Sequence, residues 1–452
     1  MKQNIMGTKP IPPLLLGMAF PIMVSMLVQA LYNIIDSVFV SHISDAALTA
    51  VSFAYPVQML VISVSVGTGV GVNALLSRRL GEGNRNAADK IAHNGVLLML
   101  CSWAVFAFFG LFFSTVFFRF FTSNPAVIAD GAVYLRICLV FSGGMFMQIL
   151  MERFIQVSGR TVFQMISQAA GAIANIVLDP IFIFGLCGAP KMGVAGAAVA
   201  TVIGQWLGFL LAWFFNHKYN HEVHIHLRCL KFDKASVVGI YRVGLPSIIM
   251  QSIGSIMNFG MNKVLMAFSE SAVSVLGIFF KLQSFVLMPG FGLTNALVPI
   301  VGYNYGARNR DRIMQSIKVC MISMTLLQTA GMLLFELAPN LLLGLFGGDD
   351  IARIGVPALR IIAVSFPIAG VAIVLSSLFQ ALDEGFFSLA MSAFRQLFIL
   401  LPVAWLLSLT GNLDAVWSSF VIAEVISIVF ALFLFYRTYK NKIQKLNQID
   451  FH

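Results

Sequence analysis

The chain has 452 residues, of which 59% are hydrophobic and only 11% are charged, and its mean hydropathy is +0.88. About 25% of the residues in a soluble domain are charged, so this composition excludes an ordinary soluble enzyme or binding domain. The formal net charge is +10. Its basic residues are spread over the loops between apolar segments, so we expect no nucleic-acid partner. The expected surroundings are a lipid bilayer.

Twelve segments are long and apolar enough to span a bilayer as helices of about 20 residues. In chain order they cover residues 12–40, 50–77, 90–115, 131–156, 162–185, 193–215, 238–266, 274–300, 313–338, 355–380, 386–409 and 412–436. The first segment is too long for a cleavable signal peptide, so we expect it to remain as a membrane anchor. The expected fold class is an all-α polytopic membrane protein with twelve transmembrane helices.

Lys and Arg are distributed unevenly between the loops. Of the 29, 21 lie on the side of the N-terminus, 5 lie on the opposite side and 3 lie within spans. Cytoplasmic loops carry the excess of Lys and Arg. We therefore expect a bacterial inner (plasma) membrane protein with both termini in the cytoplasm.

The two halves of the sequence repeat each other. At an offset of 225 residues, RRLGEGNRNAAD at 78–89 recurs as YNYGARNRDRIM at 303–314, and Pro21 pairs with Pro246. Each half has six spans, an even number, so the repeats are parallel and form two six-helix bundles related by pseudo-two-fold symmetry. The expected division is an N-terminal lobe (1–215), a cytoplasmic linker (216–237), and a C-terminal lobe with a cytoplasmic tail (238–452).

Four histidines gather in or beside the linker. They are His217, His221, His224 and His226. Their spacing matches no common metal site, and no acidic or cysteine partners recur elsewhere in the sequence. We interpret the segment as a solvated linker and expect no resident metal or cofactor.

The fifth span carries an acid within an apolar run, NIVLDPIFIFG at 175–185. A charge at the centre of a membrane helix costs about 2.5–3.5 kcal/mol, so Asp179 is expected to be functional. Asn175 lies four residues earlier, on the same helical face. Pro180 removes a backbone N–H and makes a natural kink. An acid, an amide and a kink on one wall indicate an ion or proton site.

The first and sixth spans carry matching polar positions. In the first span Gln29, Asn33 and Asp36 form one polar stripe, and Pro21 is a bend point. The first and fifth spans run in the same direction, so Asp36 and Asp179 are expected at similar depth in the outer half of the membrane. In the sixth span Thr201 and Gln205 share a face.

We expect the two acids to face each other in a poorly hydrated cleft, where protonation of either acid would change the charge of the cavity. This change could bend the first helix about Pro21 and close a cation site. Pro21 and Pro180 are the expected hinges. The expected substrate cavity is lined by polar residues of both halves, namely Gln29, Asn33, Gln205, Gln251, Asn258 and Gln283. Glu424, in the last span, is an isolated acid to which the pattern assigns no role.

The repeat of twelve spans, LDPIFIFG at 178–185, GVAGAAVAT at 193–201 and RRLGEGN at 78–84 resemble the multidrug and toxic compound extrusion (MATE) family. The likeness is to its MepA-like and DinF-like bacterial branch. The resemblance implies an antiporter that exports cationic amphipathic drugs or toxic organic compounds in exchange for H⁺ or Na⁺ by alternating access. It also implies that the residues that couple transport to the ion, and would hold Na⁺, are Asp36, Asn175, Asp179 and Thr201. The coupling ion stays open.

Three other readings compete with an exporter. A lipid-linked oligosaccharide flippase has a similar two-lobe architecture, but its anionic substrate would require arginines where the first lobe presents carboxylates. A membrane-embedded enzyme would need a cluster of nucleophile and base or of metal ligands within the spans, and His93 alone does not supply one. A channel would not require a repeat hinged at a proline. We expect a monomeric, non-enzymatic exporter of small organic cations.

Overall fold

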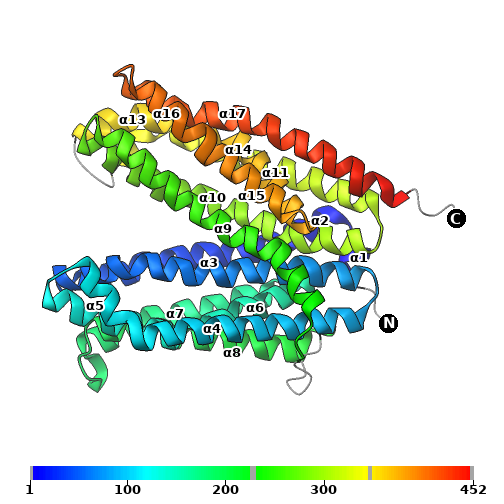
Figure 1. Cartoon of the computed structure of the whole chain (residues 1–452), viewed down its shortest axis with the longest axis horizontal. Coiled ribbons are helices and arrows are strands. Elements are labelled where there is room, and N and C mark those ends of the chain that lie inside the picture. The colour runs from blue at the N-terminus through cyan, green and yellow to red at the C-terminus, as the bar shows by residue number, and fades with distance from the viewer. Residues whose placement is uncertain (1–3, 224–230, 345–348, 448–452) are drawn as a thin grey trace. The chain divides into compact units, whose positions relative to one another are not determined.

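The computed structural model describes residues 4–223, 231–344 and 349–447, and these residues form helices without strands (Figure 1). Within these described ranges, ten helices are long and apolar enough to cross a membrane. Two bent helix pairs bring the number of spans to twelve if each pair is one span. The expected all-α polytopic fold is confirmed. His224 and His226 lie outside the described residues.

The first half of the chain contains α1 (Ile5–Thr8), α2 (Ile11–Ser41), α3 (Asp45–Gly81), α4 (Arg85–Phe121), α5 (Pro125–Val140), α6 (Gly143–Val157), α7 (Val162–Phe184), η1 (Leu186–Gly188) and α8 (Val194–Tyr219). The second half contains α9 (Lys234–Met266), α10 (Glu270–Gly306), α11 (Arg310–Leu337), α12 (Pro339–Leu343), α13 (Asp349–Ala363), α14 (Phe366–Ala381), α15 (Gly385–Ala393), η3 (Phe394–Leu400), α16 (Leu401–Ser408), α17 (Leu413–Thr438), η4 (Tyr439–Ile443) and η5 (Gln444–Asn447). The bent pairs are α5 with α6, at 41°, and α13 with α14, at 51°.

The internal repeat is visible in the helix ends. Helices α3 and α10 both have 37 residues and begin 225 positions apart. Asn84 caps α4 by accepting a hydrogen bond from a backbone N–H at 3.0 Å, and Asn309 caps α11 in the same way at 3.1 Å. The preceding residues, Gly83 and Arg308, both have positive φ, at 73° and 55°. The repeated loop therefore has the same local conformation in both halves, and the repeat is confirmed.

The chain forms two compact units. The amino-terminal unit consists of Val24–Leu80 and Asn84–Gly244, and the carboxy-terminal unit consists of Met1–Met23, Gly81–Gly83 and Leu245–His452. Helix α2 thus passes from one unit to the other after Met23, and α9 does so after Gly244. Pro21 and Pro246, which pair in the repeat, lie within three residues of these points.

The start of the chain is held within the carboxy-terminal unit by side chains of α10 and α11. The guanidinium of Arg312 donates hydrogen bonds to the carbonyls of Met6, at 2.8 Å, and Lys9, at 2.7 Å. The amide of Asn304 donates to the same Met6 carbonyl at 3.2 Å. These bonds satisfy carbonyls around the short helix α1, which has too few residues to be stable alone.

A buried polar network joins three helices of the amino-terminal unit. The side-chain oxygen of Gln156, on α6, accepts hydrogen bonds from Asn73 and Arg153, each at 2.9 Å. Its side-chain nitrogen donates to Gln164, on α7, at 3.0 Å. All four side chains are less than a tenth exposed. Because buried polar groups need partners, the network fixes how these helices meet.

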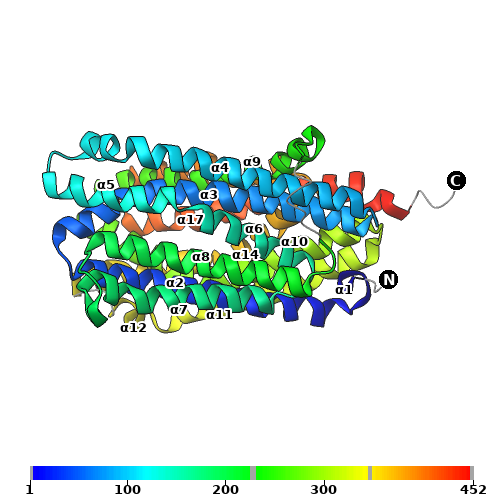
Figure 2. The same cartoon turned by 90° about the horizontal axis from the view of Figure 1, so that it is seen from below.

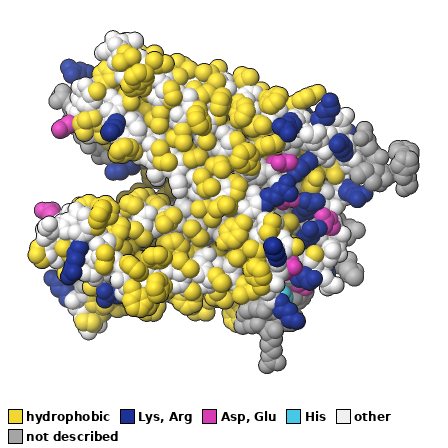
Figure 3. Space-filling model, in the orientation of Figure 1, with side chains coloured by type: hydrophobic (Ala, Val, Ile, Leu, Met, Phe, Trp, Pro, Cys, Tyr) yellow, Lys and Arg dark blue, Asp and Glu magenta, His cyan; other side chains and the backbone are white. Residues whose placement is uncertain are grey.

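The surface suits a bilayer. Large apolar side chains project from the long helices, as with Phe112 and Phe120 of α4, which are 64% and 86% exposed. On the face shown in Figure 3, hydrophobic side chains cover long stretches of helix, and Lys and Arg gather toward helix ends. This distribution is the one expected of helices surrounded by lipid tails and ending at headgroups.

Candidate functional site

Two acids meet inside the amino-terminal unit. The carboxyl groups of Asp36, on α2, and Asp179, on α7, are close enough to interact electrostatically. Asp179 is completely buried and Asp36 is partly buried. Two ionised carboxylates repel each other at close range, so a proton or a cation between these acids would stabilise them.

Asn175 and Thr201 complete this group. The Asn175 amide nitrogen lies 3.4 Å from Asp179 Oδ1 and 3.3 Å from Thr201 Oγ1. One oxygen each of Asp36, Asn175 and Asp179 is buried and makes no hydrogen bond. Unpartnered oxygens of carboxylates and an amide are ligands suited to a hard cation such as Na⁺, and the acids alone can hold a proton.

Close packing of α7 and α8 brings these groups together, and the two helices run side by side in both views (Figures 1 and 2). A Cβ on Gly171 would lie 2.6 Å from the Gly204 carbonyl oxygen, and a Cβ on Gly204 would lie 2.6 Å from the Gly171 carbonyl oxygen. A side chain at either position would push the two helices apart. The glycines therefore allow the two backbones to approach closely, as small residues do in membrane helices. Asn175 is one turn after Gly171, so the same approach places its amide beside Thr201.

Four further polar residues surround the acids and were not predicted. Tyr32 lies one turn before Asp36 on α2 and is close enough to interact electrostatically with both acids. Gln58, on α3, donates to the Tyr134 hydroxyl at 3.1 Å and contacts Cys138 Sγ at 3.7 Å. The four-residue spacing of Tyr32 and Asp36 is a signal that could have identified Tyr32. The other contacts join residues at least 76 positions apart and leave no local pattern.

The predicted cavity residues lie in both units and are described within each. In the amino-terminal unit Gln29 and Asn33 of α2 are exposed, and Gln205 of α8 is partly buried. In the carboxy-terminal unit Gln251 and Asn258 of α9 are exposed, and Gln283 of α10 is partly buried. These side chains are accessible, and their contact with substrate stays a prediction.

The predicted hinges are both prolines inside continuous helices. Pro21 is buried in α2, and Pro180 follows Asp179 directly in α7. Because proline has no N–H, residue 180 cannot donate to the carbonyl one turn earlier, which weakens α7 beside the acid. Their action as hinges stays a prediction.

At two positions that correspond to this site, the second repeat has apolar residues. At the 225-residue offset Asp36 corresponds to Met261. Helices α8 and α17 both have 26 residues, and Thr201 and Phe420 are the eighth residue of each. Met261 and Phe420 belong to the apolar core of the carboxy-terminal unit. At these corresponding positions, only the first repeat presents polar groups.

The expectation that Glu424 is an isolated acid is wrong. Arg395 Nη1 donates to Glu424 Oε1 at 2.8 Å, so the acid is one half of an ion pair. The partners belong to separate spans and are 29 residues apart. Helical periodicity relates positions within one helix and does not predict such a pairing.

Comparison with known proteins agrees with the repeat and the fold. The MatE family model matches residues 21–181 and 246–406, two segments that begin 225 positions apart and together cover more than half of the chain. The multidrug export protein MepA of Staphylococcus haemolyticus (strain JCSC1435) is 24% identical over 421 residues, which are 92% of each chain. MepA of Staphylococcus aureus (strain MSSA476) is 24% identical over 429 residues, which are 94% of each chain.

Solved structures share the whole architecture. An outward-facing multidrug resistance MATE family transporter of the MOP superfamily has a TM-score of 0.91 and 26% identity, over 99% of both chains. A MOP superfamily transporter from Pyrococcus furiosus Vc1 (DSM3638), described as having a binding pocket of reverse polarity, has a TM-score of 0.89 and 26% identity, also over 99% of both chains. These relatives are transporters and not enzymes. The chain is therefore a multi-pass membrane protein that belongs to the MatE family of multidrug efflux transporters.

Proposed function

We propose that this protein is a secondary antiporter that exports cationic amphipathic organic compounds in exchange for H⁺ or Na⁺ by alternating access. The observation that carries the proposal is the proximity of Asp36 to Asp179, with Asn175 and Thr201 beside them. The MepA relatives are named multidrug export proteins, which is consistent with such substrates.

Competition for one negative site couples the two fluxes. The acid pair attracts a proton, a sodium ion or the positive end of an organic cation, and each neutralises the same charge. A ligand shifts a conformational equilibrium only by its difference in affinity for the two states. Exchange follows if the organic cation is released on the outside when the inorganic ion binds there. Bending of α2 at Pro21 and of α7 at Pro180 would link occupancy of the acids to that release.

An anionic substrate fits this site poorly. The lipid-linked oligosaccharides carried by a flippase present phosphate groups, and buried carboxylates would repel them. Asp36 and Asp179 therefore favour a cation exporter over the flippase alternative.

The test is counterflow of ethidium in proteoliposomes, with a pH gradient and a sodium gradient imposed separately. We expect one gradient to drive uptake by the wild-type protein and Asp36→Asn or Asp179→Asn to reduce the driven rate at least tenfold. Asp45→Asn is the matched control, because Asp45 is an exposed aspartate at the start of α3. Wild-type rates in both site variants would disprove coupling through this pair.

We further propose that the protein is a monomer in the bacterial plasma membrane with both termini in the cytoplasm. The excess of Lys and Arg on the side of the termini supports this orientation. Fluorescent tags that mature only in the cytoplasm should give signal at either end of the chain. Signal at one end alone would contradict an even number of spans.

A further inference from the structure

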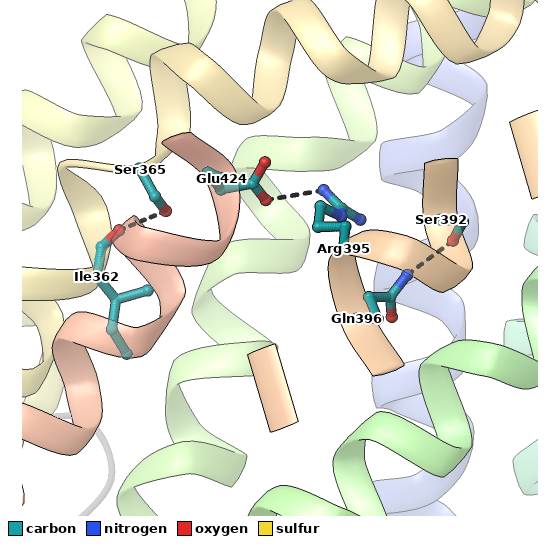
Figure 4. A network of polar contacts seen from close by, with 6 residues as sticks. All are labelled: Ile362, Ser365, Ser392, Arg395, Gln396 and Glu424. Atoms are coloured by element: carbon teal, nitrogen blue, oxygen red, sulfur yellow. Dashed lines mark hydrogen bonds and ion pairs between the residues drawn. The ribbon is translucent and has the colours of Figure 1, made fainter. Parts of the chain in front are cut away.

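The carboxy-terminal unit holds a charged pair within its membrane-spanning helices, Arg395 with Glu424 (Figure 4). Their side chains are 26% and 12% exposed, and the ion pair measures 2.8 Å. Ionisable residues inside spans are costly and usually functional. Apolar residues often replace a buried ion pair without loss of stability, so packing alone does not explain this one.

The pair lies on the repeat counterparts of α7 and α8. The span Gly385–Ser408 has 24 residues and α7 has 23. The longer span contains the π-helical segment η3, and Arg395 is the second residue of that segment. Such turns frequently occur at functional sites. Glu424 is the twelfth residue of α17, as Gln205 is of α8.

The side chains of Arg395 and Glu424 differ in how many of their hydrogen-bonding groups remain unused. Guanidinium has five N–H donors, and the hydrogen bond described for Arg395 uses one nitrogen toward Glu424 Oε1. In Figure 4 the other end of the guanidinium points away from Glu424. Glu424 Oε2 is buried and has no partner. The unused hydrogen-bonding groups that a ligand can reach are therefore the N–H donors of Arg395, which is the more exposed of the two side chains.

The neighbouring polar side chain does not occupy the remaining N–H donors of Arg395. The amide of Gln396, the next residue, donates to Ser392 Oγ at 2.8 Å and is turned away from Arg395 (Figure 4). A guanidinium with free N–H groups pairs best with a planar oxyanion, above all a carboxylate, through two parallel hydrogen bonds.

We propose that Arg395 is a binding site for the carboxylate of amphipathic substrates, and that Glu424 orients the guanidinium and balances its charge between ligands. The ligand carboxylate uses the N–H groups that face away from Glu424. This inference rests on the proposed function and names the residue that would hold the carboxylate of a substrate with both a positive charge and an acid. Arg395 is then the residue that distinguishes an acid from its ester.

The test compares three fluorescent probes on the purified full-length protein. Norfloxacin has a basic amine and a carboxylate, its ethyl ester lacks the free acid, and ethidium has only a positive charge. We expect Arg395→Gln to raise the Kd of norfloxacin at least tenfold, about 1.4 kcal/mol. The Kd values of the ester and of ethidium should change less than about twofold. Arg360→Gln is the matched control, because Arg360 pairs with Glu336 at 4.0 Å in the same unit and is 52% exposed.

The variant Glu424→Gln distinguishes a ligand-binding role of Arg395 from a purely structural role in the ion pair. Removing the carboxylate leaves the full charge of Arg395 for the ligand, so norfloxacin binding should be kept or strengthened. Equal losses in Glu424→Gln and Arg395→Gln would overturn the inference, as would equal losses for norfloxacin and its ester. If Arg395→Gln fails to fold, the double variant Arg395→Gln/Glu424→Gln, which leaves no unpaired charge, takes its place with the same expected selectivity.

The measurements with ethidium distinguish the failure of the Arg395 proposal from the failure of the antiporter proposal. Wild-type protein that binds and transports ethidium but does not prefer norfloxacin over its ester would refute the Arg395 site and leave the cation antiporter intact. Failure of Asp36→Asn and Asp179→Asn to affect ethidium transport would refute the antiporter mechanism, whatever norfloxacin does.

Discussion

Replacing Gly204 by alanine should separate α7 from α8 and dismantle the polar group beside Asp179. The new Cβ would lie 2.6 Å from the Gly171 carbonyl oxygen, and ordinary contacts begin at 3.4 Å, so the helices must move apart by about 0.8 Å. That displacement would extend the 3.3 Å distance between Asn175 Nδ2 and Thr201 Oγ1 to about 4 Å, beyond hydrogen-bonding range. Overpacking of this kind costs about 1–3 kcal/mol.

Two measurements test this reasoning. Unfolding by SDS in mixed micelles should show the loss of stability, and ethidium counterflow should show a weaker response to the driving gradient. Gly171→Ala should behave in the same way, since its Cβ would meet the Gly204 carbonyl oxygen at the same distance. Gly277→Ala is the control, because a Cβ there meets nothing within 4 Å, and helical propensity predicts a gain of about 0.5–1 kcal/mol. Unchanged stability and coupling in Gly204→Ala would refute the claim that these glycines set the site.

Three further predictions concern local structure. Gln156→Leu should lower the free energy of SDS unfolding by at least about 2 kcal/mol, because three buried partners lose a hydrogen bond; a change below about 0.5 kcal/mol would contradict the network. Gly83→Ala should cost about 1 kcal/mol in the same assay, since φ is +73° there, whereas Gly17→Ala, in open space inside α2, should cost nothing. Hydrogen bonds from the Ser236 hydroxyl and backbone N–H lower the pKa of Asp233, just before α9. Its contribution is therefore present above the unfolded pKa of about 3.9 and lost as the pH falls through the folded pKa, so the melting-temperature difference between wild type and Asp233→Ala should close only below about pH 4.

Sequence reasoning succeeded where one helix carries the signal. The spans follow from runs of apolar residues, and the four-residue spacing of Asn175 and Asp179 predicts a shared face. The repeat added a second kind of evidence, because residues 225 positions apart adopt the same caps and the same positive φ. Sequence reasoning also predicted that Asp36 and Asp179 face each other at similar depth, and the structure places them close enough to interact electrostatically.

Sequence reasoning failed where the geometry depends on two helices at once. The Arg395–Glu424 pair joins two spans, and Arg395 lies in a π-helical segment that hydrophobic periodicity does not reveal. The membership of Met1–Met23 in the carboxy-terminal unit was equally hidden, since a repeat assigns a whole helix to one lobe, whereas packing differs along its length.

The anchoring of the first residues has a consequence for biosynthesis. Arg312 lies 306 residues after Met6, whose carbonyl it binds. At roughly 5–20 residues per second, a ribosome needs about 15–60 s to make the intervening chain. During that time α1 and the beginning of α2 lack the neighbours that hold them in the finished protein. The contacts of the first helices are therefore among the last to form. Nascent chains truncated before α11 should expose α1 to protease.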